Sequence, residues 1–152
     1  MDWYPHVTVA TVIEDNGKFL LVEEYADSEL VFNQPAGHLE RNESLIEAAQ
    51  RETLEETGWT VEILGVVGVG LYTAPPKLAT KNSATTYMRT CFFGRALQHD
   101  ASRKLDAGIE RAVWLSYAEI NALASRMRSP LVIKVIEQYL NGHRYPLSSI
   151  FA

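Results

Sequence analysis

Residues 37–59 read GHLERNESLIEAAQRETLEETGW, and this stretch predicts one amphipathic helix with a defined start and end. Ser44 and Glu47 form an S-x-x-E capping box, in which each side chain satisfies a free backbone N–H group of the first turn. Gly58 suits the left-handed conformation that commonly ends a helix. The residues between them place apolar side chains at helical spacing: Leu45, Ile46, Ala48, Ala49 and Leu54. We therefore expect a helix between Ser44 and Gly58.

Three glutamates in the last two turns of this helix are unfavourably placed. Glu52, Glu55 and Glu56 lie near the negative end of the helix dipole, where a cation is preferred by about 0.3–1 kcal/mol. Their i, i+3, i+4 spacing also puts them on one face, where like charges repel by about 0.2–0.5 kcal/mol per pair. Arg51 can offset part of this cost by pairing with Glu55 and Glu47. A solvated helix end would tolerate the remaining electrostatic cost, whereas a bound Mg²⁺ or Mn²⁺ would make the arrangement of the three glutamates favourable.

The complete segment resembles the Nudix box, G-x5-E-x7-R-E-U-x-E-E-x-G-U, in which U is a bulky apolar residue. Thr53 is the one departure, because it occupies an apolar position without removing a carboxylate. We expect Thr53 to pack its methyl group inward. The matching residues are Gly37, Glu43, Arg51, Glu52, Glu55, Glu56, Gly58 and Trp59.

The resemblance implies an enzyme that hydrolyses phosphoanhydride bonds of small phosphorylated molecules with the help of Mg²⁺ or Mn²⁺. A di- or triphosphate can approach an acidic cleft only if divalent cations bridge the carboxylates and the phosphate oxygens. In this family the usual metal ligands match Glu52, Glu55, Glu56 and the backbone carbonyl of Gly37. The same likeness implies an α/β/α sandwich, with a mixed sheet flanked by helices.

The proton-transfer group is left open by the sequence. Glu56 is one candidate for the general base, and Glu110 is the other because family members often carry an extra acid in this region. Glu110 is equally compatible with a solvated strand end, and Asp106 is a weaker candidate. Arg51 is expected to orient Glu55 and to reach Glu43 at the helix start.

Four further residues are candidates for substrate binding. Gln34 and His38 lie on the loop that leads into the helix, and Tyr72 could stack on a planar ring. Arg89 interrupts an apolar strand, where an inward guanidinium would suit a phosphate. The alternatives are packing for Tyr72 and a solvated, outward position for Arg89.

Length, composition and charge limit the class of protein. A chain of 152 residues with 47% hydrophobic residues predicts one domain, residues 1–152, with a sizeable core. A net charge of −5 argues against binding a nucleic-acid polymer. Cys91 is the single cysteine, so no internal disulfide can form, which fits a reducing cytoplasm. We expect a soluble cytoplasmic protein without membrane segments, as a monomer or homodimer.

The rest of the chain predicts an α/β or α+β arrangement. Asn16-Gly17 is a strong hairpin signal between two apolar runs. Glycines within residues 61–72 suggest bulges in a long strand. Strands are expected at residues 7–13, 18–24, 30–32, 61–72, 85–97 and 110–115, a loop at 73–83, and late helices at 116–125 and from Ser129-Pro130 to Gly142.

The flanking segments narrow the family resemblance. The runs PHVTVA (5–10), NQPAGHLE (33–40), RSPLV (128–132) and GHRYPL (142–147) look like those of bacterial phosphatases within the family. That likeness implies release of orthophosphate from nucleoside tri- and diphosphates, thiamine diphosphate and hydroxymethylpyrimidine diphosphate. The alternatives are a pyrophosphohydrolase acting on ADP-ribose, diadenosine polyphosphates or oxidised nucleotides, and a Nudix-fold binding module without hydrolysis.

Overall fold

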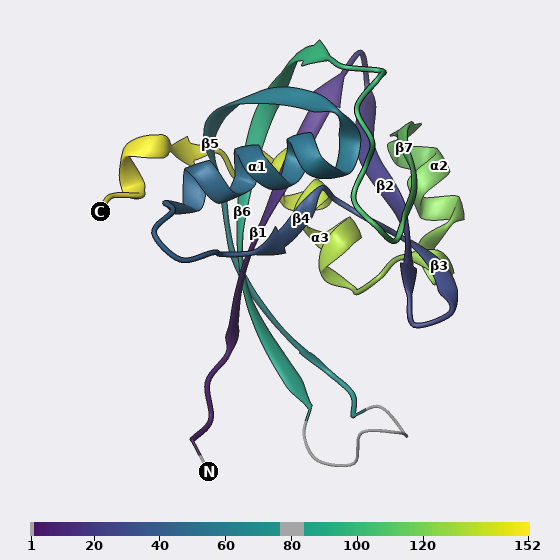
Figure 1. The fold of residues 1–152 in the computed structure, drawn as a ribbon. Coiled ribbons are helices and arrows are strands. Elements are labelled where there is room, and N and C mark those ends of the chain that lie inside the picture. Colours follow the sequence, from purple (N-terminus) through teal and green to yellow (C-terminus); the bar gives the residue numbers. More distant parts are fainter. Residues whose placement is uncertain (1, 77–83) are drawn as a thin grey trace.

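The computed structural model describes residues 2–76 and 84–152, and within them eight strands form one sheet in two parts. In the larger part β1 (His6–Asp15) pairs in parallel with β6 (Thr85–His99) and antiparallel with β4 (Ala36–His38). Beyond β6 lie β5 (Trp59–Ala74) and the short β8 (Tyr145–Pro146), both antiparallel. Figure 1 shows β5 and β6 as a long hairpin that extends past the body of the molecule.

The smaller part of the sheet is an antiparallel set in which β2 (Lys18–Ala26) lies between β3 (Glu29–Asn33) and β7 (Ile109–Ser116). It is joined to the larger part by the β1–β2 hairpin. Asn16 and Gly17 both adopt positive φ, 50° and 78°, as the expected two-residue turn requires. The predicted hairpin is therefore confirmed.

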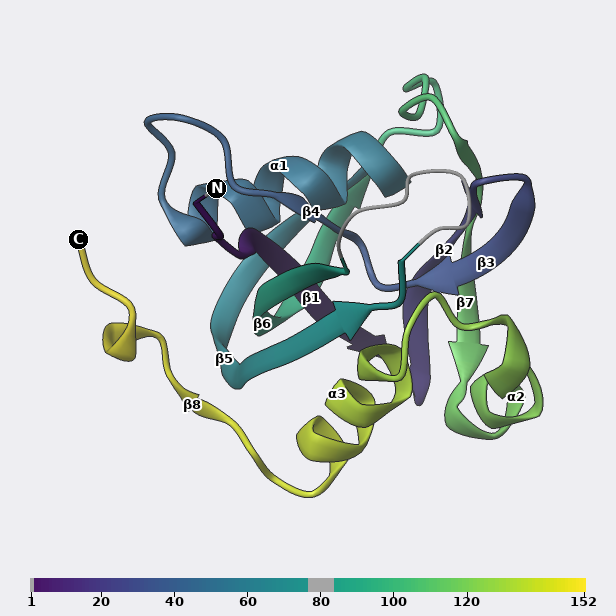
Figure 2. The same ribbon diagram turned by 90° about the horizontal axis from the view of Figure 1, so that it is seen from below.

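Helices cover both faces of the larger sheet, as Figure 2 shows, so the expected α/β/α sandwich is confirmed. One face carries α1 (Leu45–Thr57), and the other carries α3 (Leu131–Leu140). The shorter α2 (Tyr117–Ala122) and the 3₁₀ turns η1 (Ala124–Arg126) and η2 (Leu147–Ser149) complete the described helical segments. None of the described helices is long and apolar enough to cross a bilayer.

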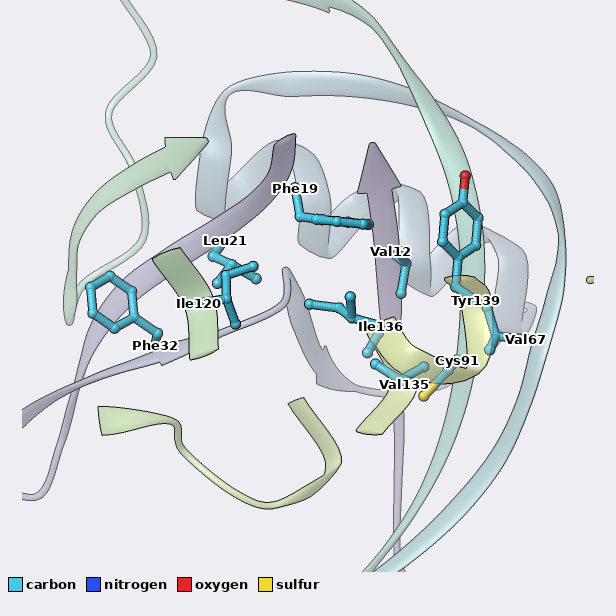
Figure 3. Packing of buried hydrophobic residues seen from close by; sticks show 11 residues of the cluster. Val12, Phe19, Leu21, Phe32, Val67, Cys91, Ile120, Val135, Ile136 and Tyr139 are labelled. Carbon is cyan, nitrogen blue, oxygen red and sulfur yellow. The ribbon is translucent and has the colours of Figure 1, made fainter. Parts of the chain in front are cut away.

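The core has two halves because β1 is buried on both faces. Val9 and Ile13 point toward α1, whereas Ala10 and Val12 point toward α3, as strand alternation requires. The α1 side packs Leu20, Ala48, Ala49, Val61, Ile63, Val66 and Phe92 with Val9 and Ile13. The opposite side, shown in Figure 3, packs Phe19, Leu21, Phe32, Val67, Cys91, Ile120, Val135, Ile136 and Tyr139 with Ala10 and Val12.

The capped helix is as the sequence predicts. Ser44 accepts a hydrogen bond from the Glu47 N–H, and Glu47 accepts one from the Ser44 N–H. Gly58 is left-handed, with φ 77°, and donates its N–H to the Leu54 carbonyl. Thr53 is fully buried and satisfies its hydroxyl on the Ala49 carbonyl, so its place in an apolar position costs no hydrogen bond.

Other boundaries differ from the prediction. The strand β4 lies in the segment expected to be a loop. It was not predicted because its three residues have no strand-like pattern of their own and form a strand by pairing with β1. The β5–β6 register shifts next to Gly65 and Gly68, which confirms the expected bulges at these two glycines, whereas Gly70 pairs with Arg89 without a shift. Strand β5 continues to Ala74, and residues 77–83 of the expected loop lie outside the described residues.

Candidate active site

The end of α1 brings two box glutamates together with a third acid. One carboxylate oxygen each from Glu52, Glu55 and Asp106 lies within 4.8 Å of the others, the only such group of three metal-ligating side chains among residues 2–76 and 84–152. The Glu52 side chain is 12% exposed and that of Glu55 is 29% exposed. All three donors are carboxylate oxygens, so the set suits a hard divalent cation such as Mg²⁺ or Mn²⁺.

Asp106, rather than Glu110, is the acid that the region before β7 contributes to this group. The Asp106 N–H donates to the Glu55 carbonyl at 3.0 Å, which ties the preceding loop to the end of α1. Glu110 is exposed, and the β2–β7 pairing shifts past it from Glu23↔Arg111 to Glu24↔Ile109. The structure therefore places Asp106, and not Glu110, beside the two box glutamates. The ranking of Glu110 above Asp106 as a general base stays a prediction.

Arg51 holds the acids of the box in place. Its Nε and Nη2 atoms donate to both oxygens of Glu43, at 2.9 and 2.7 Å. Its Nη1 atom donates to Glu52 at 2.7 Å and to Glu55 at 3.2 Å. These contacts raise the pKa of Arg51 and lower that of Glu43. The contacts expected with Glu55 and Glu43 are present, whereas Glu47 serves the helix cap instead.

A further Arg51 contact links α1 to β4. The Nη2 atom of Arg51 donates to the backbone carbonyl of His38 at 3.0 Å. The adjacent Gly37 lies directly against Glu52: a Cβ atom added there would come within 2.2 Å of the Glu52 carboxylate. The glycine of the box is therefore required by close packing against an acid, which spacing in the sequence does not reveal.

Glu56 occupies a different environment from the other two late glutamates of α1, Glu52 and Glu55. It is 7% exposed, and its Oε1 atom accepts a hydrogen bond from the Ala36 N–H at 2.8 Å. Burial raises its pKa to about 9, with smaller contributions from Glu24, Glu52 and Asp106. Glu56 lies outside the group of three acids described above. Without a cation, it is therefore a protonated, neutral acid at pH 7.

This raised pKa predicts a pH dependence of stability in the metal-free protein. The pKa of Glu56 is about 9 in the folded protein against an ordinary value of 4.5. The stabilisation that comes from protonated Glu56 is therefore fully present below pH 4.5 and is lost as the pH rises toward 9. Burial raises the pKa of Glu52 in the same direction. In urea titrations with EDTA, the free energy of unfolding should fall with pH across this window, and less steeply for Glu56→Gln. Parallel curves for the two proteins would contradict the assignment.

A cleft of about 360 Å³ reaches the acidic site at Gly37, which lies against the Glu52 carboxylate, although none of the acids Glu52, Glu55, Glu56 and Asp106 lines it. Three of the four predicted substrate-binding residues, His38, Tyr72 and Arg89, line it. Its wall also includes Thr8, Ala26, Ala36, Gly37, Ala74, Tyr87, Ser129 and Leu131. The structure thus brings three of the predicted substrate residues and the Gly37 end of the acidic site into one cleft.

Gln34 is the predicted substrate residue that does not line this cleft. It is 1% exposed, and its Nε2 atom donates to the Val132 carbonyl at 2.8 Å. This contact links the segment before β4 to the first turn of α3. Its role in the described structure is therefore to connect two elements, and the expected substrate contact is not supported.

Sequence reasoning missed a network of polar side chains in the cleft wall. Arg89, 6% exposed, donates from Nη2 to the Asn33 Oδ1 atom at 2.8 Å. Asn33 in turn donates to Glu24 Oε1 at 3.1 Å, and Arg128 Nη1 donates to the same oxygen at 2.9 Å. We call Glu24, Asn33, Arg89 and Arg128 the polar wall. The available signal was the pair of acids, Glu23 and Glu24, inside an apolar strand.

His38 belongs to a cluster with one neighbour on β1 and one on β6. Its Nε2 atom lies 3.1 Å from Nδ1 of His6, and both rings contact Tyr87 edge-on. Burial lowers the pKa of His38, with smaller contributions from His6 and Arg128. The His38 ring is therefore neutral at pH 7 and can donate or accept a hydrogen bond in the cleft.

Comparisons with known proteins agree with this geometry. A family model described as the NUDIX domain matches residues 4–135. The chain is 42% identical over 146 residues to the Phosphatase NudJ of Escherichia coli strain K12, covering 96% of this chain and 90% of that protein. A solved NUDIX hydrolase from Nitrosomonas europaea has a TM-score of 0.90 and 45% identity, covering 98% of this chain and 97% of that one.

A more distant solved structure shows the same fold alone. An ADP-ribose pyrophosphatase from Streptococcus suis 89-1591 matches with a TM-score of 0.67 at 16% identity, covering 93% of this chain and 96% of that one. At this identity the likeness carries no information about substrate. The NudJ and Nitrosomonas europaea proteins are the relatives that bear on chemistry.

Proposed function

Because this chain belongs to the Nudix hydrolase family, we propose that it is a divalent-metal-dependent phosphatase that releases orthophosphate from small diphosphates and triphosphates. The observation that carries the proposal is the group formed by Glu52, Glu55 and Asp106 beside the cleft. Its three clustered acids repel one another unless a cation is bound, and a polyphosphate supplies the complementary negative charge. The 42% identity to the NudJ phosphatase supports the choice of a phosphatase.

We assign the metal to Glu52, Glu55 and Asp106, with the Gly37 carbonyl and Glu56 as the remaining candidate ligands. A bound Mg²⁺ or Mn²⁺ would neutralise charge on the transferring phosphoryl group and lower the pKa of an attacking water. Arg51 keeps Glu52 and Glu55 at a fixed separation through Nη1. These contacts preorganise the carboxylates before substrate arrives.

Two candidates for the proton-transfer group remain, and burial favours Glu56 over Glu110. Glu56 is buried beside the acidic group, where its carboxyl is held by the Ala36 N–H. Glu110 is exposed in the irregular part of the β2–β7 pairing. A general base must be ionised and within hydrogen-bonding reach of the attacking water. Glu56 interacts electrostatically with Glu52 and Asp106, so a cation bound there would lower its raised pKa and ionise it.

The proposed substrates are nucleoside tri- and diphosphates, thiamine diphosphate and hydroxymethylpyrimidine diphosphate. The cleft has aromatic side chains from Tyr72 and Tyr87 for a planar ring, and neutral His38 near the Gly37 end. The net charge of −5 fits a small-molecule substrate rather than a nucleic-acid polymer. We further propose that the protein acts in the cytoplasm, as a monomer or homodimer.

Two other functions have less support. A pyrophosphohydrolase acting on ADP-ribose, diadenosine polyphosphates or oxidised nucleotides shares the fold, as the Streptococcus suis structure illustrates, but not the level of identity. A binding module without hydrolysis would not need the complete set of box acids. Here Glu52, Glu55 and Glu56 are all present, and Arg51 contacts the first two.

A substrate panel tests the proposed function directly. The purified protein is assayed with Mg²⁺ on nucleoside diphosphates and triphosphates, thiamine diphosphate, ADP-ribose and a diadenosine polyphosphate, and the products are identified. We expect orthophosphate from the first three groups. If cleavage is confined to ADP-ribose or the diadenosine polyphosphate, the protein is a pyrophosphohydrolase and the proposal of a phosphatase is wrong. If no substrate is hydrolysed, the result favours a binding module.

A further inference from the structure

The polar wall of the cleft contains a buried carboxylate, Glu24, of which only one oxygen accepts hydrogen bonds from the described residues. Glu24 is 8% exposed and lines the cleft. Among the described residues, the hydrogen bonds that its side chain accepts, from Asn33 and Arg128, both go to Oε1. An ionised carboxylate is an acceptor only and can take several hydrogen bonds. Its second oxygen, Oε2, therefore has acceptor capacity for a donor that enters the cleft.

The neighbouring residues hold this carboxylate in one position. Asn33 is itself fixed by Arg89, whose guanidinium is almost completely buried. Arg128 approaches from the segment before α3, where its N–H donates to the Phe32 carbonyl at 2.8 Å. Supported from three separate elements, Glu24 is a preorganised acceptor rather than a flexible surface acid.

The remaining walls of the cleft suit a flat ring. Tyr72 from β5 and Tyr87 from β6 both line it, and Leu131 contributes an apolar surface. Aromatic side chains can stack on any planar ring and do not by themselves discriminate between rings. Discrimination must therefore come from polar groups that meet the ring edge, and the polar wall supplies them.

We propose that Glu24 accepts a hydrogen bond from an exocyclic amino group on the ring of the substrate. This inference rests on the proposed function, because it assigns the ring-bearing part of the same substrate to the polar wall. A ring that carries a carbonyl oxygen at this position would place two acceptors against each other. A hydrogen bond to a charged group is stronger than one between neutral groups, so the expected discrimination is about tenfold or more.

Matched pairs of nucleotides test the amino-group preference. CMP and UMP differ at one ring position by amino against carbonyl, and GMP carries an amino group that IMP lacks. Their binding is measured by calorimetry with Mg²⁺, using monophosphates because they lack the anhydride bond to be cleaved. We expect the amino partner to bind about tenfold more tightly in at least one pair. Equal affinities in both pairs would overturn the inference without any need for a variant.

The variant Glu24→Gln tests the residue itself. Glutamine can keep an oxygen toward Asn33 and Arg128 but presents an NH₂ group in place of Oε2, so the amino preference should disappear or reverse. Inorganic tripolyphosphate has no ring, so the variant should lose less kcat/KM with tripolyphosphate than with a nucleoside diphosphate whose ring carries an amino group. A retained amino preference, or an equal loss with tripolyphosphate, would show that Glu24 acts only structurally.

Glu23→Gln is the matched control. Glu23 is the preceding residue, is equally buried at 6% exposed, and also contacts two arginines, Arg111 and Arg126. It does not line the cleft, so its variant should keep the wild-type amino preference. If the preference is present but no substrate yields orthophosphate, the proposed function fails while the assignment of Glu24 stands. Loss of the preference in Glu23→Gln as well would contradict the assignment.

Discussion

Replacing any one of Glu52, Glu55 and Glu56 with glutamine is expected to lower the rate of orthophosphate release about 10³-fold. Glutamine keeps the shape of each side chain but removes its charge. For Glu52 and Glu55 this weakens the group of oxygen ligands shared with Asp106. For Glu56 it removes a buried carboxyl that can exchange a proton. Initial rates at increasing Mg²⁺ concentration measure the effect, and more Mg²⁺ should be needed by the Glu52 and Glu55 variants.

Glu47→Gln is the control for these variants. Glu47 is on the same helix but lies in its first turn, where its side chain accepts from the Ser44 N–H. Glutamine also serves at this position of a capping box, so activity and stability should stay close to wild type. Without metal, the Glu52 and Glu55 variants should unfold no more easily than wild type, since they lose mutual repulsion. Near-wild-type turnover in all three active-site variants would defeat the metal-site assignment, as would full activity in EDTA.

The substitution Gly37→Ala is expected to separate activity from stability. The new Cβ would lie 2.2 Å from the Glu52 carboxyl carbon, so that carboxylate must move. Because the clash is with the far end of a flexible side chain, the fold can absorb it at about 1 kcal/mol or less. Displacing a catalytic group by about 1 Å can cost about 10²-fold in rate. We therefore expect turnover to fall about 10²-fold with little change in melting temperature.

Gly68→Ala is the matched control, because a Cβ added at Gly68 would meet no atom within 4 Å. Both glycines are in strands, and neither requires positive φ. The control should keep wild-type turnover and Mg²⁺ dependence. Full activity in Gly37→Ala would show that the proposed metal-binding role of Glu52 does not depend on the observed position of its carboxylate. A large fall in melting temperature would instead mean that the strand β4 does not tolerate the added methyl group.

Local sequence determined the elements whose interactions are local. The helix α1 begins at its capping box and ends at Gly58 because the side chains that satisfy its end groups lie within four residues of it. The Asn16-Gly17 turn follows from backbone conformations that these two residues adopt readily. The box spacing also placed Glu52 and Glu55 on one helix face, and Arg51 close enough to contact both.

Strand pairing was predicted less well, because it depends on partners elsewhere in the chain. The three residues of β4 carry no strand pattern of their own and form a strand because β1 offers an edge. The end of α3 also differs from the prediction. Gly142 has φ 89° as a terminating glycine should, but the helix itself ends two residues earlier, at Leu140.

The sequence by itself determined the family of this protein and a helix whose acidic C-terminal end is suited to a divalent cation. Only the tertiary structure decided which side chains complete that site. It placed Asp106 beside Glu52 and Glu55 through a backbone tether to Glu55, and it placed Gln34 in a contact with α3. It also assembled the polar wall, whose members come from distant segments. The physical reason is the sequence separation of the interacting residues. Helix caps and helix faces depend on neighbours within a few residues, whereas a cleft depends on packing between elements that are distant in the sequence.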